Sequence, residues 1–155
     1  MHVWRLCRRP FAKKPLDGGG GLHASGRWHS APRLIVYASE ALALAGLETL
    51  VHVDPDLPPD DLVALQIEVP RGVSIRQLRP AELPRSWRRY PAPRSVQMLG
   101  DAWLDGRHSA VLRVPSVLIP SEFNYLINPQ HPEAEHIIIV AKSPFTFDAR
   151  LIGRA

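Results

Sequence analysis

The stretch RLIVYASEALALAGLETLVH, residues 33–52, combines the two kinds of secondary structure that we expect throughout this chain. The run Arg33–Tyr37 predicts a short buried strand, because β-branched and aromatic residues favour strands. Glu40–His52 predicts a helix that is apolar almost all round, which is typical of a buried helix. Ser39 suits the N-cap of this helix, and Glu40 suits the positive end of its dipole. A strand followed at once by a helix indicates a fold that mixes both.

Short strands dominate the rest of the pattern. Sixteen prolines in 155 residues predict many short segments and few long helices. We expect a second helix at Ser95–Leu104, and a loop rich in Asn, Pro and His after Ile119. Further strands or apolar runs are expected at Val3–Leu6, Asp61–Val69, Ala110–Val114, Ser116–Ile119, His136–Val140 and Phe145–Phe147. These elements predict a single α+β domain over residues 1–155, with a mixed, mostly antiparallel sheet and a few packed helices.

Composition excludes several classes of protein. Apolar residues make up 45% of the chain, enough for one core, but no run approaches the roughly 18 apolar residues that span a bilayer. The basic segment Met1–Pro15 is not followed by the long apolar stretch of a secretory signal. We therefore expect a soluble, cytoplasmic protein without a membrane partner. Cys7 is the only cysteine, which excludes an internal disulfide and favours a structural thiol over a nucleophile.

The positive charge is concentrated in one part of the chain. The formal net charge of +4 is modest for a dedicated nucleic-acid-binding protein. Between residues 71 and 94 the only acid is Glu82, against seven arginines: Arg71, Arg76, Arg79, Arg85, Arg88, Arg89 and Arg94. This cluster is either a solvated surface or a docking face for phosphates or an acidic partner. A non-catalytic basic module that binds nucleic acid or a protein therefore stays an alternative.

Three polar side chains occupy unexpected positions. Glu48 lies within the apolar helix, where only His52 offers a cation one turn away. Because buried polar groups need compensation, Glu48 is either half of an exposed structural Glu–His pair or a carboxylate directed into a cleft. Arg27 follows the glycine-rich loop 17–21, and arginine is well suited to grip a phosphate or carboxylate. Tyr37 is either an ordinary aromatic at a sheet edge or a ring that stacks on a flat heterocycle such as nicotinamide.

Three more candidates lie downstream, between Val114 and Pro132. Ser116, Asn124 and Asn128 can all form hydrogen bonds in a site. Each of them, taken alone, is equally well explained by turn chemistry.

Together these segments resemble the RES-domain proteins, the toxin halves of bacterial toxin–antitoxin pairs, named after an Arg, a Glu and a Ser. The matching stretches follow the family's order: Gly26–Trp28, Val36–Ser39, Leu47–His52, Val114–Ser116 and Asn124–Pro132. The three name residues fall on Arg27, Glu48 and Ser116. Two departures lie beside Arg27: His29 replaces the usual Asn, and Ala24–Gly26 replaces a double glycine.

The resemblance implies a fold related to the ADP-ribosyltransferases and chemistry on NAD. Described members destroy NAD by phosphorolysis or hydrolysis, or transfer its ADP-ribose to a protein. NAD would be a substrate, with phosphate as a co-substrate in phosphorolysis, and no cofactor or metal would be needed because nicotinamide is a good leaving group. The resemblance also implies a hetero-oligomer with a small antitoxin that carries an Xre-like helix-turn-helix domain.

The resemblance assigns a role to each candidate. Glu48 would stabilise the charge that develops on the ribose, Arg27 would hold the pyrophosphate or an incoming phosphate, and Ser116 would form hydrogen bonds in the pocket. The remaining candidates would contact NAD or support Glu48. NAD would be bound by Tyr37, Ser39, Asn124 and Asn128, and Glu48 would be supported by His52.

Overall fold

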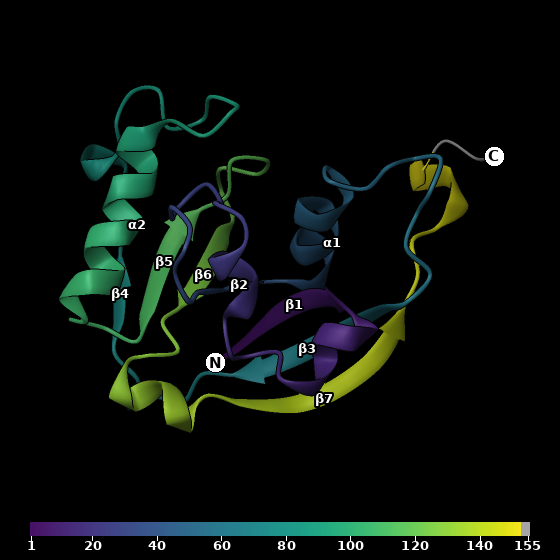
Figure 1. The fold of residues 1–155 in the computed structure, drawn as a ribbon, viewed down its shortest axis with the longest axis horizontal. Helices are drawn as coiled ribbons and strands as arrows, with labels where there is room; N and C mark the ends of the chain where they lie inside the picture. The colour runs from purple at the N-terminus through teal and green to yellow at the C-terminus, as the bar shows by residue number, and fades with distance from the viewer. Residues whose placement is uncertain (153–155) are drawn as a thin grey trace.

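One seven-stranded sheet runs through the computed structural model, which describes residues 1–152 (Figure 1). The strands are β1 (His2–Arg8), β2 (Val36–Ser39), β3 (Leu62–Glu68), β4 (Ile75–Gln77), β5 (Val111–Pro115), β6 (Phe123–Ile127) and β7 (Ile138–Phe145). Their order across the sheet is β4-β5-β6-β2-β1-β3-β7. Only the pair β4–β5 is parallel within this described part of the chain. The predicted α+β class with a mixed, mostly antiparallel sheet is confirmed.

Hydrophobic side chains fill both faces of the sheet, because successive residues of a strand point to opposite sides. Val111 and Ile127 belong to one cluster, whereas their neighbours Leu112 and Leu126 belong to the other. The second cluster also contains side chains of helix α2, among them Trp103. The face that carries Leu112 and Leu126 is therefore the face on which α2 packs.

Two α-helices and five short 3-10 helices connect the strands in the described part of the chain. The α-helices are α1 (Leu42–Leu50) and α2 (Arg94–Gly106), and the 3-10 helices are η1 (Arg9–Lys13), η2 (Gly19–Leu22), η3 (Pro80–Glu82), η4 (Pro132–His136) and η5 (Ala149–Ile152). Figure 1 shows α2 beside β4 and β5 and α1 at a distance from it, above β1. No helix among residues 1–152 is long and apolar enough to cross a membrane.

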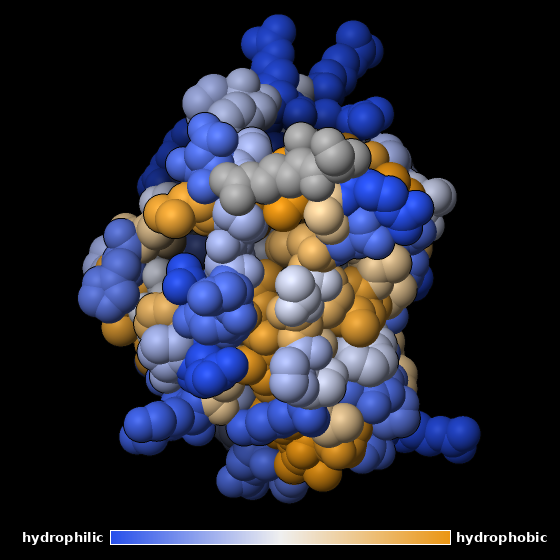
Figure 2. Space-filling model, turned by 90° about the vertical axis from the view of Figure 1, so that its right-hand side faces the viewer, coloured by the Kyte–Doolittle hydropathy of each residue, from blue (hydrophilic) through white to orange (hydrophobic). Residues whose placement is uncertain are grey.

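The helix predicted at Glu40–His52 is shorter and more exposed than expected. It spans Leu42–Leu50, and Ser39 is the last residue of β2 rather than its N-cap. The prediction of burial all round is wrong, since Leu47 is 39% exposed and Val51 57% exposed. The helix packs one stripe onto the sheet and leaves the opposite stripe uncovered. Figure 2 looks onto the side of the molecule where η5 and the end of β7 lie, and apolar surface is visible there among polar residues.

Most predicted strands are present, but several boundaries move. Asp61–Val69 corresponds closely to β3, whereas the strand predicted at Arg33–Tyr37 begins only at Val36. The apolar run Ser116–Ile119 is a turn. The predicted loop after Ile119 contains β6, whose side chains are mostly buried. Short β4 was not predicted, because its three residues are all exposed and carry no apolar alternation.

Candidate functional site

The register between β2 and β6 creates the centre of the candidate site. Ser39 lies opposite Asn124 in this antiparallel pair. Side chains directly opposite each other lie on the same face of the sheet. Leu126 is two residues along from Asn124, so Ser39 and Asn124 lie on the face on which α2 packs. The Ser39 hydroxyl donates a hydrogen bond of 2.7 Å to Oδ1 of Asn124, and both side chains are buried. Because its Oδ1 is engaged, Asn124 presents its Nδ2 group away from β2.

Ser116 reaches the same face from the neighbouring strand. Val114 pairs with Asn124, and Ser116 follows two residues later, so alternation directs both side chains to the side of Asn124. Its hydroxyl accepts hydrogen bonds of 3.1 Å from the backbone N–H groups of Leu118 and Ile119. The side chain is completely buried. Ser116 therefore organises the turn after β5 and points its own hydroxyl hydrogen toward α1.

Glu48 receives hydrogen bonds from both residues. Oε1 of Glu48 accepts one of 2.8 Å from Ser116 Oγ and one of 2.6 Å from Asn124 Nδ2. Oε2 has no hydrogen-bond partner among residues 1–152. One donor from β6 and one from the turn after β5 thus fix a half-buried carboxylate from a helix, and one oxygen is left to meet a ligand. The Glu–His pair considered as an alternative does not form in the described structure, where His52 is exposed and no hydrogen bond joins it to Glu48.

Arg27 lies close enough to Glu48 for a favourable electrostatic interaction, without a direct ion pair in the described structure. Its Nη1 donates hydrogen bonds to the carbonyl oxygens of Trp87, at 2.7 Å, and Arg89, at 3.0 Å. Burial lowers the pKa of Arg27 from its ordinary value, and the charge of Glu48 opposes this shift. The guanidinium keeps its charge because its ordinary pKa is so high. Its other N–H groups have no partner in the described part of the chain and remain able to bind an anion.

Tyr37 supports the backbone around Arg27. Its hydroxyl accepts a hydrogen bond of 3.2 Å from the Trp28 N–H and lies 2.8 Å from Nδ1 of His29. Burial raises the pKa of Tyr37, so its phenol stays protonated. Since the Trp28 N–H is a donor, the Tyr37 hydrogen is free to donate to His29. The stacking on a flat heterocycle considered for Tyr37 can therefore involve only its ring, and it stays a prediction.

His29 is nearly completely buried beneath the same loop. Its Nε2 lies 3.1 Å from the Ala24 carbonyl oxygen, and its Nδ1 accepts from the Gly26 N–H at 3.2 Å. Burial lowers the pKa of His29. This pattern matches a neutral imidazole that donates through Nε2 and accepts through Nδ1 from Tyr37 and Gly26. His29, a departure from the usual pattern in the resemblance, thus holds the loop that carries Arg27.

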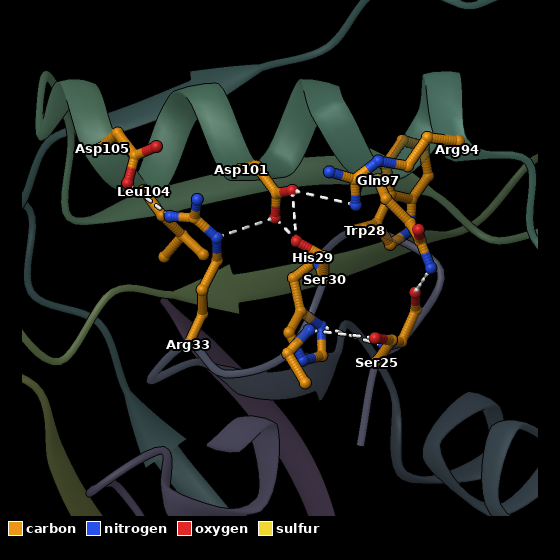
Figure 3. Close-up of polar contacts among 12 residues, drawn as sticks. Ser25, Trp28, His29, Ser30, Arg33, Arg94, Gln97, Asp101, Leu104 and Asp105 are labelled. Atoms are coloured by element: carbon orange, nitrogen blue, oxygen red, sulfur yellow. Dashed lines mark hydrogen bonds and ion pairs between the residues drawn. The ribbon is translucent and has the colours of Figure 1, made fainter. Parts of the chain in front are cut away.

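Helix α2 also fixes the loop that carries Arg27 (Figure 3). Asp101 projects from α2 toward Ser30 and accepts hydrogen bonds from its N–H at 2.8 Å and its Oγ at 2.6 Å. Arg33 Nε lies 3.1 Å from the same carboxylate. One turn earlier, Gln97 donates a hydrogen bond of 3.1 Å to the Gly26 carbonyl. Sequence reasoning missed Asp101, because an acid in an amphipathic helix normally indicates a solvated stripe.

Asn128 lies outside this cluster. It follows the end of β6, whereas Asn124 is near its start, so four residues or about 13 Å separate them along the strand. Asn128 is completely buried, donates a hydrogen bond of 3.3 Å to the Leu104 carbonyl and accepts one of 3.0 Å from the Gln130 N–H. These contacts join β6 to the end of α2. The NAD-binding role of Asn128 stays a prediction, and in the described structure its side chain is engaged with Leu104 and Gln130.

Two surface pockets in the described part of the chain lie away from the Glu48 cluster. One is lined by residues of the 127–137 region and Leu16, the other by residues around Arg33, Leu104 and Gln130. We therefore assign the candidate site from its hydrogen-bond geometry, in which two buried donors hold one oxygen of the Glu48 carboxylate. Among residues 1–152, no group of three His, Cys, Asp or Glu side chains could hold a metal ion.

Comparison with known proteins agrees with the resemblance to the RES-domain proteins. The family model of the RES domain matches residues 2–148 of this chain. The chain is 42% identical over 153 residues to a Toxin Res from Pseudomonas putida, covering 97% of this chain and 99% of the relative. It is 37% identical over 156 residues to the Prs ADP-ribosylating toxin of Sphingobium sp. (strain YBL2), covering 98% of this chain and 97% of the relative.

A solved structure shares the fold. The crystal structure of the M. tuberculosis MbcT–MbcA toxin–antitoxin complex contains a chain that superposes with a TM-score of 0.76 at 14% identity, covering 98% of this chain and 86% of that chain. With the motif order, the family match and the relatives in agreement, this chain belongs to the RES-domain family.

Proposed function

We propose that this protein is a RES toxin that cleaves the bond between nicotinamide and ribose in NAD. The observation that carries the proposal is the Glu48 carboxylate, which Ser116 and Asn124 hold by one oxygen while the other has no partner in the described structure. A preorganised charge of this kind is most useful where positive charge develops during a reaction.

The residues suit the charge changes of this cleavage. When the bond between ribose C1′ and the nicotinamide nitrogen breaks, the electron pair leaves with nicotinamide and the ribose becomes oxocarbenium-like. Glu48 stabilises that charge or orients a ribose hydroxyl, and the free N–H groups of Arg27 bind a phosphate of the substrate. An acceptor oxygen then bonds to C1′ and loses its proton to the solvent. Neither a metal ion nor a further cofactor is required.

Two acceptor classes remain for the ADP-ribosyl group. Water or inorganic phosphate would make the protein an NAD-degrading enzyme, with ADP-ribose or its phosphate as the product. A protein acceptor would make it an ADP-ribosyltransferase, and the name of the Sphingobium relative, an ADP-ribosylating toxin, favours this second candidate. Glu48 and Arg27 would serve identically in both.

Product analysis separates these candidates. Purified protein is incubated with NAD alone, then with phosphate varied, and then with cell lysate and labelled NAD. Release of ADP-ribose or its phosphate supports NAD degradation, and labelled protein bands support transfer. Glu48→Gln keeps the size of the side chain but removes its charge, so it should lose NAD cleavage and relieve growth arrest while its unfolding transition is unchanged. Wild-type turnover by this variant would refute the mechanism.

A non-catalytic basic module is the remaining alternative. It would use the arginines between residues 71 and 94 to bind nucleic acid. Nucleic-acid binding that survives Arg27→Ala, together with no detectable NAD cleavage by the wild type, would favour it over the enzyme.

We also propose that the toxin acts in the cytoplasm, where NAD is available, and is neutralised there by an antitoxin with an Xre-like helix-turn-helix domain. The structural neighbour belongs to a toxin–antitoxin complex, which supports a partner of this kind. Tagged Glu48→Gln protein isolated from its native cell should retain a small helix-turn-helix protein that restores growth when it is expressed with the wild type. Recovery without such a protein would argue against the partner.

A further inference from the structure

The segment 84–93 between η3 and α2 is attached directly to the candidate site. Arg27 Nη1 donates hydrogen bonds to the carbonyl oxygens of Trp87 and Arg89. The ring of Trp87 also packs against that of Trp28, with centroids 6.3 Å apart. Arg27 and its neighbour thus hold this segment by both its backbone and its aromatic side chain.

Arg88 lies between the two residues that Arg27 holds. Its Nη2 makes a long hydrogen bond of 3.5 Å to the carbonyl oxygen of Val117, and Val117 directly follows Ser116. Ser116 in turn donates to Glu48. The Arg88 guanidinium is therefore placed between the Arg27 segment and the turn that holds Glu48.

The charge of Arg88 is not compensated by a carboxylate within residues 1–152. Glu82 pairs with Arg76 and Arg79, at 3.2 Å and 3.5 Å, and accounts for two of the cluster's arginines. Arg94 lies 3.7 Å from Asp101. No ion pair of this kind involves Arg88, whose contact with the protein is the long bond to a carbonyl. Most of its donors are therefore available to an anion.

We propose that Arg88 is a second phosphate-binding residue of the site, which contacts the diphosphate of NAD together with Arg27. The diphosphate carries a negative charge on each of two adjoining phosphates, and guanidinium groups bind such oxygens through paired hydrogen bonds. The arginine-rich stretch therefore includes one member that belongs to the substrate site rather than to a separate docking surface. This inference rests on the proposed function for its substrate.

Calorimetric titration with ADP-ribose, which carries the diphosphate, tests Arg88 without requiring turnover. All variants are made in the Glu48→Gln background so that they can be expressed. Arg88→Gln should bind ADP-ribose about tenfold more weakly or worse, the effect of losing one charge-assisted hydrogen bond. Arg88→Lys should recover part of the affinity. Arg71→Gln is the matched control, because Arg71 lies in the turn before β4, which pairs with the start of β5 whereas Ser116 follows the end of β5, and this variant should bind like the parent.

Thermal unfolding of each variant accompanies the titration. An affinity of Arg88→Gln within twofold of the parent, a lysine variant no better than the glutamine one, or an equal loss in the Arg71 control would overturn the proposal. So would a parent that does not bind ADP-ribose. Wild-type NAD turnover is measured separately: turnover without an Arg88 effect removes only this inference, whereas Arg88-dependent binding without turnover removes only the proposed function.

Discussion

Ser30 and Asp101 are joined by two hydrogen bonds, from the backbone N–H at 2.8 Å and from the hydroxyl at 2.6 Å. This contact links the loop that carries Arg27 to helix α2, across 71 residues of sequence. The placement of Arg27 therefore depends on α2, although the hydrogen bonds that Glu48 accepts within residues 1–152 come from Ser116 and Asn124 and not from this helix.

Replacing Asp101 tests this link. Its side chain is only 10% exposed, so Asp101→Ala leaves the two Ser30 donors without their partner and removes one of the two carboxylates that pair with Arg33. We expect the free energy of unfolding to fall by about 3 kcal/mol. Asp105→Asn is the matched control, because Asp105 also pairs with Arg33 from α2 but is 64% exposed and should cost less than about 1 kcal/mol. Urea unfolding measures both, and equal losses would contradict the assigned role of Asp101.

The two donors to Glu48 can be tested as a pair. Ser116→Ala and Asn124→Leu each remove one hydrogen bond to Oε1, so each should lower kcat for NAD cleavage by about tenfold to a hundredfold. KM should change much less if both residues act mainly by orienting Glu48, to which each donates a hydrogen bond. The double variant should lose less than the product of the two losses, since both act on one oxygen.

Ser39→Ala is the control for this pair, because it acts on Glu48 only through Asn124. Its effect on kcat should be smaller than that of Asn124→Leu. Steady-state kinetics that showed fully multiplicative losses, or a larger effect of Ser39, would indicate that the donors do not work through Glu48.

Two glycines on the two helices should respond to alanine in opposite directions. In α1, a Cβ at Gly46 would meet only ordinary contacts, at 3.8 Å from Phe145, so Gly46→Ala should stabilise the protein by about 0.5–1 kcal/mol. In α2, a Cβ at Gly100 would lie 1.7 Å from the Trp28 carbonyl oxygen, so Gly100→Ala should cost about 3 kcal/mol. Thermal unfolding in which Gly100→Ala is neutral would show that α2 does not approach the loop this closely.

His29 predicts a dependence of stability on pH. Burial lowers its pKa in the folded protein below the value of about 6.5 that it has when unfolded. The unfolded chain therefore binds the proton more readily, so this contribution to stability is complete above pH 6.5 and is lost as the pH falls below it. The ring faces the Tyr37 hydroxyl and the Ala24 carbonyl, and the more distant charges of Asp101 and Arg33 act in opposite directions.

Denaturant midpoints at pH 8, 6.5 and 5.5 measure this effect. His29→Asn retains an acceptor near Tyr37 but cannot be protonated, so its stability should fall less than that of the wild type between pH 6.5 and 5.5. Identical pH profiles for the two proteins would exclude a contribution from His29.

The pattern of apolar residues by itself determined the fold class, because alternation in Asp61–Val69 and the apolar spacing in Leu42–Leu50 depend on local periodicity. Local periodicity also drew attention to Glu48, a carboxylate in apolar surroundings. It failed at β6, where asparagine and tyrosine suggested a loop although the strand is buried between β2 and β5. In the folded protein, β2 and β5 provide hydrogen-bond partners for the polar groups of β6. The local sequence does not show which strands will lie beside β6.

Only the tertiary structure decided which polar residues act together. Ser39, Glu48, Ser116 and Asn124 are dispersed over the sequence, and the strand register and the position of α1 bring them into one hydrogen-bonded group. The same geometry separates Asn128 and His52 from that group, although both belong to matching segments. The type of a residue specifies which hydrogen bonds its side chain can donate or accept. Its partners are set by packing between segments far apart in the sequence, and local sequence patterns do not show that packing.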